Sequence, residues 1–464
     1  MIVYIISLLL SVVLYFYAPK SMDVSYMSVC LIISLLEITF FLFYIDKGNS
    51  EKFKKIYLRH SIIFIFCFSI VFFQCDLDYV LGLGDPNDYR LWYTGTAVCK
   101  ALALSIMAMS SFLVGCSIIA RKELIMNPKL KQTKYDTSMK SILCIIGFVV
   151  LGVYLVFVPR EYLLGGYNEG IDRGSANVLL ILLQAVFIAT FVMYSYEYKE
   201  KHEKNGSFFK ELRYPIILAF FYIGIVLITG RRTEAIRIAL LLVIVYVYSR
   251  GRYINYKLML LYGLAALLIF SVTSLLRSYK TSSFSEGVSI MAESSSISPF
   301  TQEYANSVNT LHVAVENFPD KYEYNKGITF FPAFSVLIPG LDRLISSSIG
   351  ANIMGIRSEN VITNLGLAAG EEWGMGTSAV ADVYISFGPP GVIVVFILLG
   401  MFLKLLEIGT FRKYANPFFL VLSFGCFSQI MYVCRGAIGN MFLSWSYATI
   451  LLFIFIRKRN VKSL

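Results

Sequence analysis

Long runs of apolar residues alternate with short polar segments along most of this 464-residue chain. An α-helix of about 20 residues crosses the roughly 30 Å of hydrocarbon in a bilayer. Runs of about this length predict an all-α protein with twelve membrane-spanning helices. The predicted spans lie near residues 2–18, 24–45, 61–81, 96–119, 141–158, 177–196, 214–230, 234–249, 257–276, 388–406, 417–434 and 439–456.

One polar segment, residues 277–387, is much longer than the others and separates the ninth predicted span from the tenth. We therefore predict three parts. Residues 1–276 hold spans one to nine, 277–387 form a large loop, and 388–464 hold spans ten to twelve and a short tail. A membrane protein with one large loop outside the bilayer either carries out its chemistry there or binds something there.

The composition supports a multi-span membrane protein. Hydrophobic residues make up 57% of the chain, charged residues 15%, and the mean hydropathy is +0.67. A soluble domain has about 25% charged residues, so this chain could not cover a water-exposed surface. The net charge of +11 does not indicate nucleic-acid binding, because Lys and Arg fall mainly in short segments between apolar runs.

The distribution of basic residues predicts the topology. Of the 41 Lys and Arg residues, 26 fall in alternate linkers. Basic linkers stay on the cytoplasmic side, so both termini are predicted in the cytoplasm and the large loop outside. The basic linkers are 46–60, 120–140, 197–213, 250–257, 404–414 and 457–464.

The predicted outer side carries 10 Arg and 5 Lys, whereas the inner linkers carry 18 Lys and 8 Arg. Arginine grips phosphate and carboxylate groups with two parallel hydrogen bonds, which favours an anionic ligand at the outer face. Pairing with acidic residues of the outer loops is the alternative explanation. Arg277 and Arg435 lie at outward edges and are candidate members of such an anion site.

The turn between the seventh and eighth spans is the strongest candidate for that site. Thr233 is a candidate N-cap and Glu234 follows in the first turn, while Arg231, Arg232 and Arg237 flank the helix start. Free N–H groups at a helix start and several guanidinium groups together bind anions at headgroup depth. The alternative is that these arginines only extend to the membrane surface.

An amphipathic helix is predicted early in the loop. Its start has the pattern of a cap followed by proline, and its histidine and glutamate stand four residues apart, so Glu316 could orient His312 as a base. A surface ion pair is the alternative. The residues of this pattern are Ser298, Pro299, Tyr304, Val308, Leu311, His312, Val315, Glu316 and Phe318.

Two further stretches of the loop carry candidate functions. Residues 328–340 are apolar but too short to span, which predicts a re-entrant or interfacial segment that packs on the membrane domain or lines a lipid groove. The glycine-rich exit places Glu372, Trp373, Asp382 and Tyr384 where carboxylates and aromatic rings suit a sugar. A simple turn leading into a span is the alternative.

The sequence predicts no metal and no cofactor. Only three histidines occur, and no pair of cysteines has the spacing of a metal site. The loop holds none of the eight cysteines, although Cys75 and Cys99 could pair near the outer surface.

Several short motifs, in this order, are similar to those of the bacterial Wzy-type O-antigen polysaccharide polymerases. The motifs are TGRRTEAI, FPDKYEYNKGITFFPAFSVLIPG and GMGTSAVADVYISFGPPG. In the resemblance, the basic hairpin of the family falls on Gly230, Arg231 and Arg232. The glycine-rich exit falls on Gly376, Ser378, Asp382, Tyr384 and Gly388.

The resemblance implies a GT-C-like glycosyltransferase of the bacterial inner membrane. Such an enzyme moves a growing glycan from undecaprenyl pyrophosphate onto the far end of another lipid-linked repeat unit at the periplasmic face. Membrane lipids and a chain-length regulator protein are the other implied partners. In this interpretation the arginines, with Trp373 and Tyr384, bind pyrophosphate or glycan, and His312, Glu372 or Asp382 is the base.

Three other functions remain open from the sequence. Two are enzymes: an O-antigen ligase, and a GT-C transferase that adds single sugars. The third is a flippase for lipid-linked oligosaccharides. A transporter would place charges in the middle of its spans, and Glu37 is nearly alone at that depth. The sequence therefore favours an enzyme.

Overall fold

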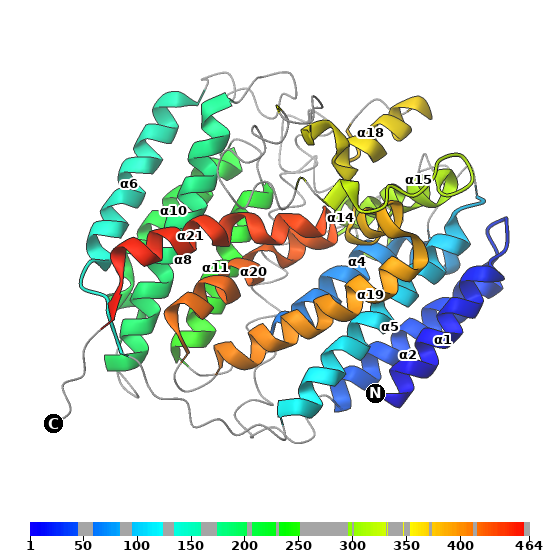
Figure 1. The fold of residues 1–464 in the computed structure, drawn as a ribbon, viewed down its shortest axis with the longest axis horizontal. Helices are drawn as coiled ribbons and strands as arrows, with labels where there is room; N and C mark the ends of the chain where they lie inside the picture. The colour runs from blue at the N-terminus through cyan, green and yellow to red at the C-terminus, as the bar shows by residue number, and fades with distance from the viewer. Residues whose placement is uncertain are drawn as a thin grey trace.

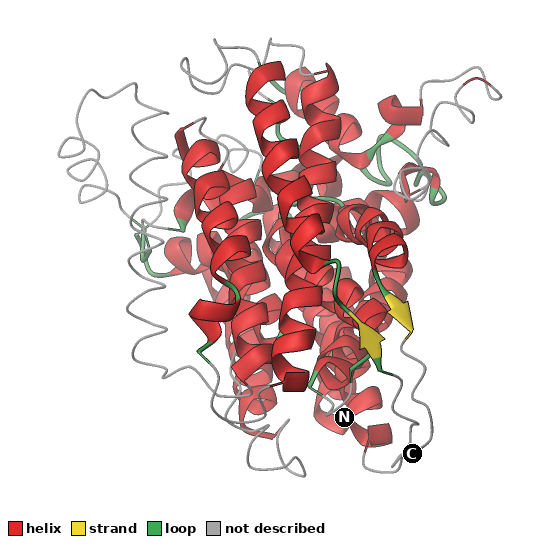
Figure 2. Cartoon of the chain, turned by 90° about the vertical axis from the view of Figure 1, so that its left-hand side faces the viewer, coloured by secondary structure: helices red, strands yellow, loops and turns green. Residues whose placement is uncertain are grey.

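In the computed structural model, the described residues of the protein form a bundle of α-helices with two short strands (Figures 1 and 2). The structure describes residues 1–44, 59–83, 95–123, 134–158, 174–201, 207–228, 232–250, 296–298, 301–330, 332, 347, 353–370, 374–411 and 415–458.

Eight described helices are long and apolar enough to cross a membrane, which confirms a multi-span protein. Two more apolar helices are shorter, and α11 has the length of a span but carries charged residues at both ends. The bundle helices are α1 (Ile2–Phe16), α2 (Val24–Tyr44), α4 (His60–Val80), α5 (Val98–Glu123), α6 (Lys140–Phe157), α8 (Gly174–Lys201), α10 (Arg213–Ile228), α11 (Arg232–Arg250), α19 (Ala379–Thr410), α20 (Pro417–Cys434) and α21 (Leu443–Phe455).

Eleven of the twelve predicted spans coincide with a described helix. The ninth, 257–276, lies outside the described residues. The boundary predicted at 387/388 falls at a break within α19, where the non-helical backbone of Gly388 separates two helical stretches, and residues 379–387 before it already form a helix. Gly388 has a φ of 67°, and Pro389 and Pro390 follow it in the first positions of the second helical stretch.

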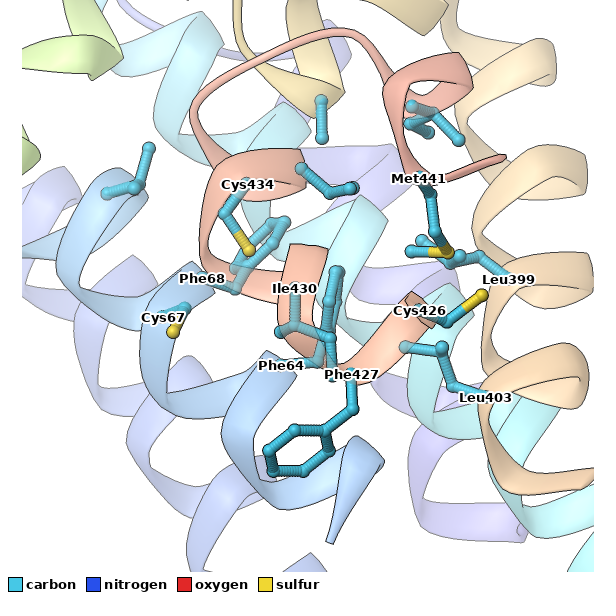
Figure 3. Packing of buried hydrophobic residues seen from close by; sticks show 14 of the residues in the cluster. Phe64, Cys67, Phe68, Leu399, Leu403, Cys426, Phe427, Ile430, Cys434 and Met441 are labelled. Carbon is cyan, nitrogen blue, oxygen red and sulfur yellow. The ribbon is translucent and has the colours of Figure 1, made fainter. Parts of the chain in front are cut away.

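The core is built from helices that are far apart in sequence. Phe64 and Phe68 of α4 pack with Phe427 and Ile430 of α20, beside Leu399 of α19 (Figure 3). Helices α5 and α19 approach so closely that Gly115 and Gly400 face the partner backbone. A Cβ atom at either position would lie 2.1 Å from a carbonyl oxygen of the other helix. Small residues allow this kind of close approach between membrane helices.

The described parts of the large loop gather at one end of the bundle, here called the loop end (Figure 1). The predicted amphipathic helix is confirmed as a helical stretch from Gln302 to Asn317, with Tyr304, Val308, Leu311 and Val315 buried. Its elements are α14 (Gln302–Ala305), η3 (Asn306–Val308) and α15 (Asn309–Asn317). Further along are η4 (Ile328–Phe330), η5 (Ile353–Ile356), α18 (Ser358–Ala368) and η6 (Ile438–Phe442).

The entry of the loop is bound to the last turns of α4. Asp78 accepts hydrogen bonds from the Ser296 hydroxyl (2.6 Å) and the Ile297 N–H (2.8 Å). Gln74 donates to the Ser298 carbonyl at 3.0 Å and accepts from Thr301 at 2.6 Å. These polar side chains at the end of α4 therefore fix where the loop begins its path over the bundle.

The opposite end of the bundle contains a buried ionic cluster. Glu407 is fully buried and pairs with Lys404, and Arg59 Nη1 lies 3.9 Å from its Oε1 atom. The Ser61 hydroxyl donates to Glu407 Oε2 at 2.5 Å. Nearby, β1 (Tyr135–Asp136) and β2 (Arg457–Lys458) form a two-stranded antiparallel ladder, and α9 (Phe208–Glu211) precedes α10.

The packing of the bundle determines the surroundings of Glu37 and of the cysteines. Glu37, in the middle of α2, is 2% exposed and accepts a hydrogen bond from Ser110 Oγ of α5 at 2.5 Å, so it is bonded within the bundle. All eight cysteines are buried, and each is a thiol rather than half of a disulfide. The predicted pairing of Cys75 with Cys99 is therefore wrong.

Candidate active site

The candidate site lies where α20 ends, at the loop end of the bundle. Helix α20 packs on α11 and α19. Both neighbours run antiparallel to it, so their first turns lie beside its last turn. The N-terminal half of α8 and the loop helix α18 reach the same place. Spans and loop therefore contribute side chains to one region.

Arg237 is held firmly at this point. Its Nη1 atom lies 2.8 Å from Glu234 Oε1, one turn earlier in α11, and its guanidinium group stacks 4.0 Å from the centre of the Tyr432 ring on α20. Gln184 of α8 donates a hydrogen bond to the other oxygen of Glu234. Contacts from three helices thus fix the orientation of one predicted anion-binding arginine.

The loop helix α18 closes this cluster from outside the bundle. Arg357 and Glu359, at its start, lie close enough to Tyr432 to interact with it electrostatically. The Asn440 side chain of η6 donates to Glu359 Oε1 at 3.1 Å. The start of α18 and the turn after α20 are therefore joined directly.

Asp382 reaches the same place from α19 but lies beneath the surface. It is 1% exposed, and its Oδ2 atom accepts a hydrogen bond from the backbone N–H of Ile438 at 3.0 Å. Its Oδ1 atom is buried and has no hydrogen-bond partner among the described residues. The hydroxyl group of Ser358, which is also buried, lies beside it.

His312 is also buried, at 1% exposure, on α15. The predicted pairing with Glu316 is wrong, because Glu316 instead pairs with Lys321 across 3.6 Å. Burial lowers the pKa of His312 to about 3. A group with this pKa accepts a proton poorly near neutral pH, so the proposed role of His312 as a base stays a prediction that this conformation does not favour.

The low pKa of His312 predicts a pH-dependent stability. Below about pH 6.5 the unfolded chain binds a proton at this imidazole, whereas the folded chain does not bind it until about pH 3. Folding stability therefore falls as the pH decreases through this window, by up to about 1.4 kcal/mol per pH unit. The thermal unfolding midpoint in detergent should decrease less between about pH 7 and about pH 5 for His312→Leu than for the parent protein. Equal decreases in the two proteins would contradict the low pKa of His312.

Tyr384 has a packing role in this structure. The residue is fully buried, and its hydroxyl group donates to the Phe318 carbonyl at 2.8 Å and lies 3.0 Å from the Tyr15 hydroxyl of α1. Its ring meets the Tyr324 ring edge to face at 5.6 Å. These contacts bind the loop segment after α15 to α19 and α1, and the sugar contact predicted for Tyr384 stays a prediction.

The remaining predicted residues are distributed as follows. Arg435 is exposed in the turn after α20, and Arg232 is the first residue of α11. Four of the predicted site residues lie outside the described residues: Arg231, Arg277, Glu372 and Trp373. Within the described ranges, no three His, Cys, Asp or Glu side chains are grouped as metal ligands would be.

Several residues of this cluster were missed by the sequence analysis. Gln184, a polar residue inside an apolar run, was a usable signal, because polar groups within spans usually face a partner. Tyr432 and Asn440 gave no signal, since aromatic and amide residues near a span end are common. Ser358 and Glu359 became informative only when the fold placed α18 over the end of α20.

Comparison with known proteins identifies the family. The family model for O-antigen polysaccharide polymerase Wzy matches residues 1–462, which is almost the entire chain. Searches of curated proteins and of solved structures each found no match. The expectation drawn from the three short motifs is thereby confirmed at the level of the family. The chain belongs to the O-antigen polysaccharide polymerase Wzy family.

Proposed function

We propose that this protein polymerises O-antigen repeat units carried on undecaprenyl pyrophosphate, at the periplasmic face of the bacterial inner membrane. A hydroxyl group on the terminal sugar of one lipid-linked unit attacks the anomeric carbon of the glycan on a second carrier. The bond from that carbon to the pyrophosphate oxygen breaks, and a new glycosidic bond forms. The hydroxyl proton passes to a base, and lipid pyrophosphate leaves as an anion.

The observation that carries this proposal is the fixed position of Arg237 at the loop end. Negative charge grows on the leaving pyrophosphate as the bond breaks, and a cation whose orientation is already set stabilises it without reorganising. Glu234, Tyr432 and Gln184 supply this preorganisation. Arg435 is exposed in the adjoining turn and is the second cation we assign to the leaving group.

The proposed topology follows from the same arrangement. The described helices that meet at the loop end run in opposite directions, as alternating spans do. With both termini in the cytoplasm, the loop end faces the periplasm, where lipid-linked units are presented. The buried cluster of Arg59, Lys404 and Glu407 then lies at the cytoplasmic end.

Arg435→Ala is expected to lower O-antigen polymerisation by ten-fold or more, because an exposed cation near the leaving group is lost while the fold is kept. Arg435→Lys should retain part of the activity, since it keeps the charge but not the two-point contact. The measurement is the lipopolysaccharide ladder of a gene-deletion strain that expresses each variant, with membrane levels matched by immunoblot.

Arg213→Ala is the matched control, because Arg213 is an exposed arginine at the opposite end of the bundle. It should restore a full ladder. A full ladder from Arg435→Ala would remove this residue from the site. A deletion strain that lost all O-antigen, including the single repeat unit, would indicate a ligase or a flippase and would overturn the polymerase assignment.

A further inference from the structure

The Asp382 side chain is buried within the protein. It is 1% exposed and lies between Ser358 of α18, which is 0% exposed, and Ile438 of η6, which is 5% exposed. A general base has to come within about 2.6–3.2 Å of the proton it removes, either directly or through one water molecule. Substrate cannot approach the carboxyl group in this arrangement, so its contacts with protein carry its role.

The main contact of Asp382 is with the turn that follows α20. Residues 435–438 form this turn, and the Ile438 N–H donates to Asp382 Oδ2 at 3.0 Å. The turn is tight, with the Gly436 N–H bonded to the Val433 carbonyl at 3.2 Å. Its first residue, Arg435, is exposed. The buried carboxyl group therefore fixes the last residue of the turn, while Arg435, the first residue of the turn, is exposed to solvent.

A second contact fixes the same turn from the loop. Asn440, two residues after Ile438, donates to Glu359 of α18 at 3.1 Å. The turn begins three residues after Tyr432, on whose ring Arg237 stacks. A displacement of the turn would thus move both cations of the proposed pyrophosphate site.

We propose that Asp382 is a positioning residue and not the base: it holds the 435–438 turn through the Ile438 amide and thereby sets the positions of Arg435 and of the Tyr432–Arg237 pair. The chemistry requires only a hydrogen-bond acceptor at the position of Oδ2. An asparagine supplies one. Its amide N–H₂ would take the place of Oδ1, beside the Ser358 hydroxyl, which has no other hydrogen-bond partner among the described residues and can accept from it.

Asp382→Asn and Asp382→Ala separate positioning from proton transfer. If Asp382 positions the turn, the asparagine variant keeps polymerase activity within about three-fold of the parent, and the alanine variant loses ten-fold or more. If Asp382 is the base, both variants lose activity to the same extent, by roughly 10²–10⁴-fold. Asp136→Ala, at an exposed aspartate of the opposite end, is the control that should leave activity unchanged.

A second measurement does not depend on the proposed function. Hydrogen–deuterium exchange of the purified protein in detergent, followed on peptides that cover residues 435–442, reports the bond to the Ile438 amide directly. Exchange at this amide should rise roughly ten-fold in Asp382→Ala and stay unchanged in Asp382→Asn. Protection that persists in the alanine variant would overturn the inference, as would an inactive asparagine variant with normal protection. If the parent protein lacked polymerase activity, the exchange result alone would decide the positioning role.

Discussion

Replacing Gly400 with leucine is expected to abolish the stably folded protein. Gly400 of α19 faces α5, and even a Cβ atom there would lie 2.1 Å from the Phe112 carbonyl oxygen and 3.0 Å from the Phe112 carbonyl carbon. Backbone atoms cannot rotate away as a side chain does, so the helices must separate along their length. The loss of folding free energy lies at or above the upper end of the roughly 1–3 kcal/mol that overpacking of a core usually causes.

The matched control is Gly224→Leu, at a glycine of α10 with no atom within 4 Å of the added Cβ position. Gly224 is exposed in an apolar helix, so leucine there faces open space. Fluorescence-detected size-exclusion chromatography of tagged variants in mild detergent measures the folded fraction. Gly400→Leu should lose the monodisperse peak and Gly224→Leu should keep it. Equal peaks would show that α5 and α19 are not in close contact.

Glu407→Gln is expected to destabilise the protein by about 3–5 kcal/mol, because it leaves two buried cations without this carboxylate. Lys404 and Arg59 are each 1% exposed and lie against a fully buried Glu407. The amide of glutamine keeps the shape and the hydrogen bond from Ser61 but supplies no negative charge. The thermal unfolding midpoint in detergent should decrease accordingly.

Two further variants make the charge explanation specific. Lys404→Met combined with Glu407→Gln removes one of the two cations, so it should be less destabilised than Glu407→Gln alone. Glu200→Gln makes the same chemical change in the pair with Lys134, whose side chains are 29% and 43% exposed. Such exposed pairs contribute about 0–1 kcal/mol. A similar decrease in both single variants would indicate that burial of Glu407 has no special role.

The helices of this fold could be predicted from hydrophobic length alone, because a span must be apolar for about 20 residues. The short helical stretch that begins at Ala379 and ends before Gly388 could not. Gly388, Pro389 and Pro390 mark the start of the second helical stretch of α19, as their pattern indicates, whereas the first stretch is held against the loop by Tyr384 and Ser386. Local sequence sets the preference of a segment for helix or turn, whereas tertiary contacts determine where a helix begins.

For the candidate site, the sequence predicted residue types better than partners. It selected Arg237 and Asp382, which the fold places around the end of α20. It assigned His312 to Glu316 because both lie on one helix face, yet the imidazole points into the bundle and the carboxylate pairs with Lys321 at the rim. Contacts between elements 50 or more residues apart, such as Asp382 with Ile438, have no local signal.

The burial of all eight cysteines makes the natural chain a ready background for chemical labelling. A charged, membrane-impermeant maleimide requires a thiol in contact with water, and no native thiol meets this condition in the folded protein. A single cysteine introduced at exposed Tyr322, within the large loop, or at exposed Ser138, at the opposite end of the bundle, would then be the only reactive thiol. The sidedness of the protein in intact cells can therefore be mapped one position at a time without first replacing any native residue.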